Sequence, residues 1–274
     1  GVAMATPQNL ALVTLTMLAF AGNSLLCRVA LKGGAIDAAS FTSLRLVSGA
    51  LMLSGLVWLQ QKQTLQVQRL TALPGDGWSA FALFAYAAGF SFAYLSMTAA
   101  TGALLLFGAV QASMMAWGLY QGERMRRLQL AGFVLAIAGL TALMLPGLAA
   151  PGIWGSSAML GAGVAWGAYS LRGRRKQTNT NINPTAATAG NFVRAAPMAL
   201  LLSAMTLPQL NVSTSGVLYA VASGALTSGV GYAVWYRVLP TLKATHAATV
   251  QLSVPVIAAL GGIVLLGEAA SWPM

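Results

Sequence analysis

The sequence predicts an all-α membrane protein, a polytopic bundle of helices that cross the bilayer many times. Nine apolar stretches of about 19 to 24 residues fill almost the whole chain, and each is long enough, at about 1.5 Å per residue, to cross a hydrocarbon core of about 30 Å. The composition agrees, because 57% of the residues are hydrophobic and only 7% are charged. The 30 glycines are typical of membrane helices that approach one another closely. Because the stretches are continuous rather than alternating, an outer-membrane β-barrel is excluded.

The predicted spans follow one another with short connections. The first, over residues 10–29, continues for about 20 residues without a basic leader or a clear cleavage site, so we expect it to remain as a helix rather than to be removed as a signal peptide. The other eight cover residues 41–59, 78–100, 102–120, 128–148, 152–171, 184–207, 216–239 and 245–266. No soluble domain fits between them.

The positive charges lie mainly in alternate connections. The chain has 15 Lys and Arg against 4 Asp and Glu, a net charge of +11. Eleven of these cations lie in the connections after the second, fourth, sixth and eighth stretches, whereas the intervening connections carry only Lys32. This asymmetry places the N-terminus in the cytoplasm, and it makes a nucleic-acid partner unnecessary. The basic run from Arg172 to Lys176 is expected to anchor the topology at anionic headgroups of the lipid bilayer.

The two halves of the chain share a pattern of residues. Three pairs recur at nearly constant separation: Gly22 and Gly167 (145 residues), Arg45 and Arg194 (149), and the Gly-Glu dipeptides at 122–123 and 267–268 (145). These pairs predict two repeats of five helices, over residues 8–148 and 152–274, the second lacking its last helix here, so that ten helices are expected and nine are visible. Because five is odd, the repeats enter the membrane from opposite sides, an inverted topology typical of secondary transporters.

These features also carry a family resemblance. The repeat, the motif AWGAYSLR of the sixth stretch, the arginines of the second and seventh, and the Gly-Glu that closes the fourth and ninth resemble the EamA-type drug/metabolite transporters. Among those, the chain is most similar to the YddG-type bacterial aromatic amino acid exporters, which implies a place in the bacterial inner membrane. The resemblance implies ten helices around a central cavity, both termini in the cytoplasm, and outward movement of amino acids and related metabolites by alternating access. The chain departs from the pattern at Ala21, where the family often has Trp, and at Val110, where the second repeat has Pro255.

Acidic side chains are absent from the middle of the predicted spans. Asp37 and Asp76 fall in connections, and Glu123 and Glu268 lie at helix ends, where pairing with nearby basic groups is the simpler interpretation. The single histidine, His246, begins the ninth stretch and is more typical of an interfacial residue than of a proton sensor. We therefore expect facilitated diffusion or exchange rather than transport coupled to protons.

One arginine lies well inside a predicted span. Arg194 is about ten residues into the seventh stretch and is expected to be the deepest cation, whereas Arg28 is near the end of the first and Arg45 only a few residues into the second. Arg194 is therefore a candidate partner for a substrate carboxylate. The alternative is a structural role as a donor to carbonyls at a helix end, which the corresponding position of Arg45 favours.

Aromatic residues suggest the chemistry of the substrate. Stacking and edge contacts with a flat ring contribute about 0.5 to 1.5 kcal/mol each beyond burial, so the aromatic side chains of the spans are candidates to bind it. They are Tyr86, Phe90 and Tyr94 on one face of the third stretch, Trp117, Trp166, Tyr169, and Tyr232, Trp235 and Tyr236 of the eighth, with Trp117 and Trp166 as the leading pair. Neutral polar partners for an amino acid are Asn23, Ser24, Gln111, Asn191 and Gln251. The alternative for each aromatic residue is packing between helices or a place in the interfacial belt.

Glycine and proline interrupt three of the later spans. Gly229 and Gly231 lie in the eighth stretch, Pro255 in the ninth and Pro197 in the seventh, and bends there are candidates for gating. Static close packing of small residues is the competing interpretation.

Several classes of function are excluded or kept open by the same residues. One His, one Cys and no midspan carboxylate leave neither a metal site nor an activated nucleophile, so no enzyme activity and no cofactor are expected. The sequence best fits an inner-membrane exporter of neutral or zwitterionic amino acids, aromatic ones among them. The alternatives are an exporter of a sugar phosphate or nucleotide sugar, which needs several cations in its pocket, and a nontransporting scaffold or receptor, favoured if side chains fill the cavity.

Overall fold

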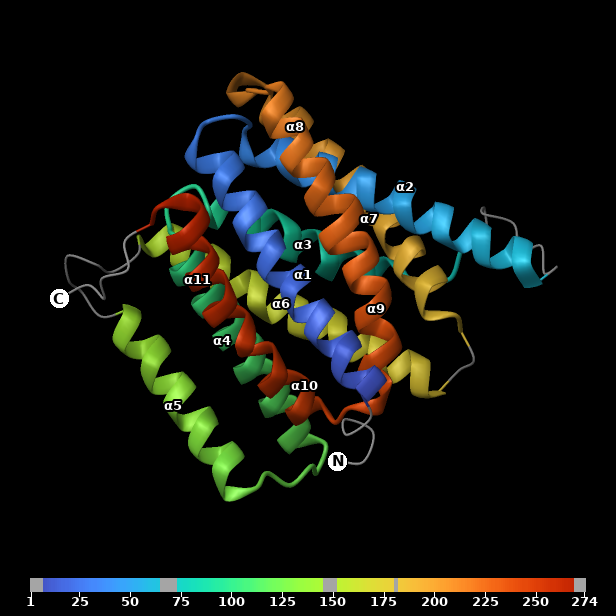
Figure 1. Ribbon diagram of the computed structural model, residues 1–274, viewed down its shortest axis with the longest axis vertical. Helices are drawn as coiled ribbons and strands as arrows, with labels where there is room; N and C mark the ends of the chain where they lie inside the picture. The colour runs from blue at the N-terminus through green and yellow to red at the C-terminus, as the bar shows by residue number, and fades with distance from the viewer. Residues whose placement is uncertain (1–6, 65–72, 145–151, 180–181, 269–274) are drawn as a thin grey trace.

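The computed structural model describes residues 7–64, 73–144, 152–179 and 182–268, and these fold into a bundle of helices (Figure 1). The first seven long helices are α1 (Pro7–Lys32), α2 (Ala38–Thr64), α3 (Gly77–Ala93), α4 (Ala99–Tyr120), α5 (Arg127–Met144), α6 (Ile153–Asn179) and α7 (Pro184–Met205). A short 3-10 helix, η3 (Leu207–Gln209), follows α7. Each of the seven long helices corresponds to one predicted stretch, in the order of the chain.

The last two predicted spans are broken helices. The eighth consists of α8 (Thr214–Val221), the π-helix η4 (Ala222–Val230), α9 (Gly231–Val238) and the 3-10 turn η5 (Leu239–Thr241). The ninth consists of α10 (Ala244–Gln251) and α11 (Ser253–Leu266), which meet at Leu252. Both interruptions lie beside residues that the sequence singled out, Gly229 and Gly231 in the eighth and Pro255 in the ninth.

Three predicted helix ends are wrong by five residues or more. α2 and α6 run beyond the predicted ends at residues 59 and 171, to Thr64 and Asn179, whereas α3 stops short. The third stretch was expected to reach residue 100, but α3 ends at Ala93 and α4 begins at Ala99. The side chain of Thr98 accepts a hydrogen bond from Thr101 N and so caps α4. Similar caps by Asp76, Asn183 and Ser213 start α3, α7 and α8.

The two Gly-Glu dipeptides end helices in a similar way. Gly122 and Gly267 follow α4 and α11 with φ angles of 87° and 63°, in the region that favours glycine. Each lets the chain turn back, so that Glu123 N donates to Gly118 O (2.9 Å) and Glu268 N to Gly262 O (3.1 Å).

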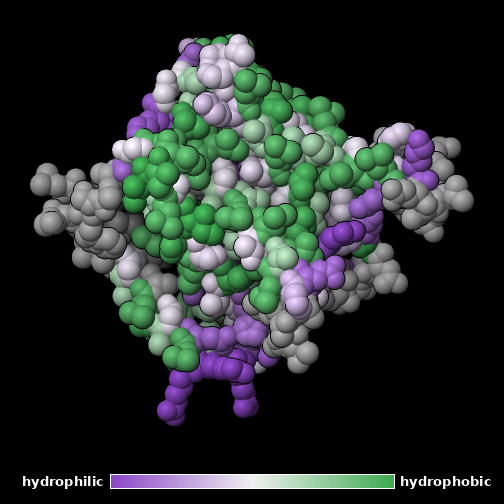
Figure 2. Space-filling view, in the orientation of Figure 1, coloured by the Kyte–Doolittle hydropathy of each residue, from purple (hydrophilic) through white to green (hydrophobic). Residues whose placement is uncertain are grey.

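Five segments are long and apolar enough to cross a membrane: Pro7–Lys32, Ala38–Lys62, Ala99–Tyr120, Thr214–Thr241 and Ala244–Leu266. Two shorter apolar helices, Gly77–Ala93 and Arg127–Gly139, accompany them. Figure 2 shows that apolar residues cover most of one face of the bundle, while strongly hydrophilic ones gather at its lower end, where α4 ends and α5 begins, and in smaller groups on the right and at the upper left of the view. The surface is that of a protein embedded in lipid.

The helices that position the core come from both halves of the chain. α2 packs along α7 and against η4, and α6 packs between α3 and α4. α1 lies beside α11, α9 and η4, whereas α5 lies at the edge of the bundle beside α4 (Figure 1). The interior is therefore enclosed by α1, α2, α3, α4, α6, α7 and the broken eighth and ninth spans.

Candidate functional site

The most unusual residue of the interior is Arg45 of α2, whose side chain is buried with 1% of its surface exposed. Its Nε donates to Ser228 Oγ (2.9 Å), and its Nη2 donates to the hydroxyls of Tyr86 (2.9 Å) and Tyr232 (2.6 Å). Nη1 is buried without a hydrogen-bond partner among the described residues. Three neutral hydroxyls thus hold the guanidinium, and the two N–H groups of Nη1 have no acceptor among the described residues.

No carboxylate in the described part of the chain forms an ion pair with Arg45. The sequence contains four acidic residues. Glu268 pairs with Arg28, Asp76 with Arg172 and Lys176, and Asp37 accepts from the backbone of Ser40 and Asn211. Glu123 folds back over Gly118 at the end of α4. A buried cation without an anionic partner is costly, which makes Arg45 a candidate to bind something that the chain does not supply.

Aromatic rings surround Arg45. Its guanidinium carbon lies 4.8 Å from the centroid of Phe90 and 5.1 Å from that of Tyr86, within the range of cation–π attraction. The ring of Trp166 lies 4.9 Å from Tyr86 and 4.7 Å from Tyr232, and Phe20 meets Trp166 edge-on at 5.5 Å. We call this group the aromatic cluster; its members are Phe20, Tyr86, Phe90, Tyr94, Phe107, Trp166, Tyr169, Phe192, Tyr232, Trp235 and Tyr236.

The backbone brings α2 and the π-helix η4 unusually close beside Arg45. A Cβ atom on Gly224 would lie 2.2 Å from Arg45 O and 2.0 Å from Ser48 Oγ, and one on Gly49 would lie 2.4 Å from the ring of Phe192. Only glycine fits at such a crossing. The crossing sets Ser228 of η4 next to Arg45, and π-helical turns often occur at functional sites.

Asn23 ties α1 to the same π-helix. Its Oδ1 accepts hydrogen bonds from Ser223 (2.8 Å), Thr227 (2.6 Å) and Ser228 (3.0 Å), and its Nδ2 donates to Thr227 O (3.4 Å). The amide is thus fully engaged in holding two helices together. Ser24, its neighbour, is buried with an unpartnered hydroxyl.

Two glutamines reach the cluster from the fourth and ninth spans. Trp166 Nε1 donates to Gln251 Oε1 (2.9 Å), and Gln251 Nε2 donates to Ala247 O (3.0 Å). Gln111 is buried, and its Oε1 lacks a partner among the described residues. Gln111 follows Phe107 by one helical turn, so both lie on the face of α4 that meets Phe20.

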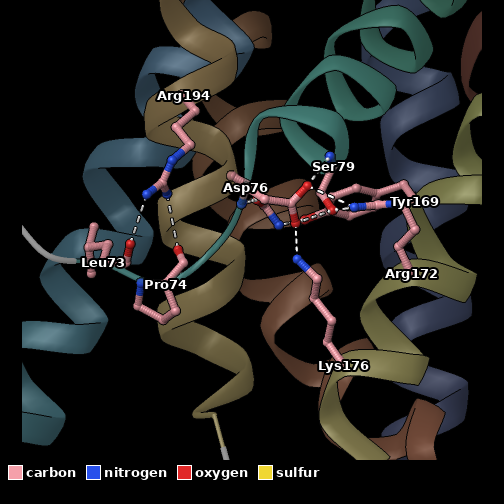
Figure 3. A network of polar contacts seen from close by, with 9 residues as sticks. Leu73, Pro74, Asp76, Ser79, Tyr169, Arg172, Lys176 and Arg194 are labelled. Atoms are coloured by element: carbon pink, nitrogen blue, oxygen red, sulfur yellow. Dashed lines mark hydrogen bonds and ion pairs between the residues drawn. The ribbon is translucent and has the colours of Figure 1, made fainter. Parts of the chain in front are cut away.

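The structure separates two predicted site residues, Trp117 and Arg194, from this group. Trp117 is 42% exposed on the outside of α4, where its ring lies beside Tyr120 (5.6 Å between centroids). Arg194, expected to be the deepest cation, is exposed and donates to Leu73 O (3.0 Å) and Pro74 O (3.1 Å) before α3 (Figure 3). Burial in the protein therefore does not follow the expected depth along the span, because Arg45 is the buried arginine of the two.

Asn191 belongs to a polar network near the basic end of the bundle, by which we mean the end with the Arg- and Lys-rich connections. Its Oδ1 accepts from Asp76 N (3.1 Å), and its Nδ2 donates to Tyr169 OH (3.3 Å). Figure 3 shows Asp76 at the centre of this network. Asp76 accepts from Arg172 Nη2 (2.9 Å), from Lys176 Nζ, and from Ser79 N and Oγ (2.9 Å each).

These contacts change the acidity of Asp76. Its partial burial raises the pKa, but the hydrogen bonds from Lys176, Ser79 and Arg172 outweigh this effect and hold the pKa of Asp76 well below its usual range. The carboxylate is therefore ionised throughout the physiological range, and it joins α3 to α6 at the basic end.

The remaining sequence predictions meet in the interior. Tyr86, Phe90, Tyr94, Trp166, Tyr169, Tyr232 and Trp235 are all buried members of the aromatic cluster. Pro197 lies inside α7 and Pro255 inside α11.

The sequence analysis missed Phe20 and Phe192 as members of the aromatic cluster, and it favoured a structural role for Arg45. The signal for Phe20 was its spacing of three residues from Asn23, which places both on one face of the first helix.

The central cavity that the family resemblance implied is filled by side chains in this structure. Trp166, Trp235 and Arg45 occupy the region between α1, α2, α6 and α9, and each has at most 2% of its surface exposed. Two hollows in the described residues are apolar and open on the outer surface, one on α2 around Leu51 and Trp58, the other between α1 and α11.

Comparison with known proteins gives three similarities. Residues 153–274 match the EamA-like transporter family. The chain is 53% identical over 262 residues to an uncharacterized protein of Pseudomonas aeruginosa, PA1977, and the match covers 95% of this chain and 87% of that relative. A crystal structure of another protein superposes with a TM-score of 0.71 at 19% identity, over 98% of this chain and 91% of the other, a likeness that shows the fold.

Proposed function

Because the chain belongs to the EamA-like transporter family, we propose that it exports neutral and zwitterionic amino acids, aromatic ones among them, by alternating access. The observation that carries this proposal is the aromatic cluster around a buried cation. Flat rings recognise a flat apolar side chain by stacking and edge contacts, and a lone cation suits one carboxylate. The aromatic rings around this buried arginine also support a finer assignment to the YddG-type aromatic amino acid exporters.

The proposed architecture is two inverted repeats, over residues 8–148 and 152–274. The similar ends of α4 and α11 at Gly122 and Gly267 support the repeat, as does the enclosure of the interior by helices from both halves. The charge asymmetry of the loops supports a cytoplasmic N-terminus in the inner membrane. Substrate then leaves the cytoplasm at the basic end, where the Asp76 network closes the bundle.

The proposed energetics are facilitated diffusion or exchange. A coupled carrier needs a group near the substrate that binds and releases a proton. The four acidic residues lie at helix ends or in connections, and none of them forms an ion pair with Arg45 among the described residues. A substrate gradient that builds up in sealed liposomes under an imposed pH gradient alone would contradict this part.

One observation favours a second candidate, a nontransporting membrane scaffold: side chains fill the centre of the bundle. Export of a sugar phosphate or nucleotide sugar is less well supported. Such anions favour several cations, whereas one arginine of the described residues, Arg45, lies over rings of the aromatic cluster.

The test is counterflow of a labelled aromatic amino acid into liposomes that contain the full-length protein, without a pH gradient. Unlabelled amino acids, sugars and phosphates serve as competitors. We expect uptake that neutral amino acids alone inhibit. If a protein shown to be folded takes up no amino acid, the scaffold is favoured. Inhibition by phosphorylated sugars would instead favour export of a sugar phosphate.

A further inference from the structure

Arg45 lacks an anionic partner, and we propose that the carboxylate of the bound solute is that partner. The site would then require a solute with one carboxylate next to a flat apolar group. This inference deepens the proposed function. Binding of the solute at Arg45 stands by itself, and the statement that the bound solute is transported rests on the proposed function.

The first step is the charge. Glu268, Asp76 and Asp37 are engaged elsewhere, and Glu123 lies at the end of α4 over Gly118. The three hydrogen bonds of Arg45 go to neutral hydroxyls. Hydroxyls solvate a guanidinium but leave its charge uncompensated in a dry interior. An anion that enters the cluster would remove this cost, so the charge itself favours binding.

The second step is the unused hydrogen-bonding capacity. Arg45 Nη1 is buried and has no partner in the described part of the chain. Tyr86 OH accepts hydrogen bonds from Arg45 and from Tyr232 OH (3.1 Å), which leaves its own proton free to donate. Arg45 Nη1 and the Tyr86 hydroxyl therefore offer two donors to the two oxygens of one carboxylate.

The third step is the surroundings. Phe90 and Tyr86 stack over the guanidinium, and Trp166 adjoins Tyr86. A carboxylate held at Arg45 would place an attached ring among these rings. A phosphate dianion would find a single cation there, so the site discriminates against it.

Arg194 shows that this arrangement is specific to Arg45. The two arginines occupy corresponding positions of the predicted repeat. Arg194 is nevertheless exposed, and its guanidinium donates hydrogen bonds to the carbonyls of Leu73 and Pro74. Arg194 is thus a matched control for the loss of an arginine.

The first experiment uses the unmodified full-length protein in detergent and needs no variant. Binding is measured by isothermal titration with phenylalanine, phenylalaninamide, which lacks the carboxylate, 3-phenylpropionate, which lacks the ammonium, and sodium chloride. We expect phenylalanine and 3-phenylpropionate to bind at least about tenfold more tightly than phenylalaninamide, equivalent to about 1.4 kcal/mol. Equal binding of the amide, or chloride as the sole anion bound, would overturn the proposal.

The second experiment compares Arg45→Gln with Arg194→Gln. The Arg45 variant should lose the preference for the acid over the amide, whereas the Arg194 variant should keep it. If Arg45→Gln does not fold, the ligand series on the unmodified protein decides. Acid selectivity without counterflow would contradict the transporter but keep the site; counterflow without acid selectivity would contradict the site alone.

Discussion

The carboxylate of Glu268 accepts a hydrogen bond from Arg28 Nε at 3.2 Å and another from the backbone N of Ala99 at 3.1 Å. The two charged side chains are only 5% and 13% exposed, and Arg28 also donates to Tyr94 O (2.8 Å). One ion pair thereby joins the end of α11 to α1 and to the start of α4. It closes the bundle at the end opposite the basic loops.

Glu268→Gln should destabilise the folded protein. The change leaves Arg28 half-buried without its anion, and breaking a buried pair in this way costs about 3 to 5 kcal/mol. Chemical unfolding of the purified protein in detergent measures the loss. The control is Glu123→Gln, because Glu123 follows the matching glycine and forms no ion pair in the described part of the chain. Equal losses in the two variants would show that the pair with Arg28 contributes nothing.

The contacts of Asp76 predict an acid-dependent stability. Its pKa is depressed in the folded state and about 3.9 in the unfolded chain, so the unfolded chain binds more protons below about pH 4. The stabilisation is therefore fully present at neutral pH and is lost as the pH falls below 4. We expect Asp76→Asn to reduce the free energy of unfolding by about 1 kcal/mol at pH 7, since the carboxylate is partly exposed. Unfolding curves between pH 7 and pH 3 should show the difference between the two proteins shrinking only below pH 4; a difference that stays constant to pH 3 would exclude the ionised network.

Trp166 and Trp117 should differ in their effect on transport. Trp166 contacts Tyr86 and Tyr232 in the interior, so Trp166→Ala should weaken counterflow of phenylalanine more than that of alanine, by about tenfold in relative terms. Trp117→Ala removes an exposed ring and should leave both rates within about twofold of normal. Equal losses for large and small amino acids in the Trp166 variant would argue against stacking.

The sequence predicted where the helices lie along the chain better than which side of each helix is buried. The length of an apolar stretch is a local property, and all nine stretches form helices, with α3 ending early because Thr98 caps the next helix. The face of each helix is not local. On α4, Gln111, Met114 and Gly118 are buried while Trp117 is exposed, although apolar residues surround the helix and leave no polar side to identify.

The burial of Arg45 could not be read from its position along the chain. Distance from the end of a span measures depth in the membrane, whereas burial depends on which helices meet that face. Arg45 faces α3 and the eighth span and is enclosed by Tyr86, Ser228 and Tyr232. Arg194 lies further into its span, yet a loop carbonyl is its nearest partner. The difference in burial between Arg45 and Arg194 comes from the crossing of α2 and η4, which depends on contacts between residues distant in the sequence.

Gly224 should tolerate no side chain. A Cβ atom there would lie 2.2 Å from Arg45 O and 2.0 Å from Ser48 Oγ, so Gly224→Ala must push η4 away from α2. Overpacking of this kind costs about 1 to 3 kcal/mol, and the shift would also move Ser228 away from Arg45. We therefore expect both a lower unfolding free energy and a loss of counterflow. Gly55→Ala on α2 is the matched control, because nothing lies within 4 Å of a Cβ there and alanine favours the helix by up to about 1 kcal/mol. If Gly224→Ala were as stable and as active as Gly55→Ala, the close crossing would not be what positions Arg45.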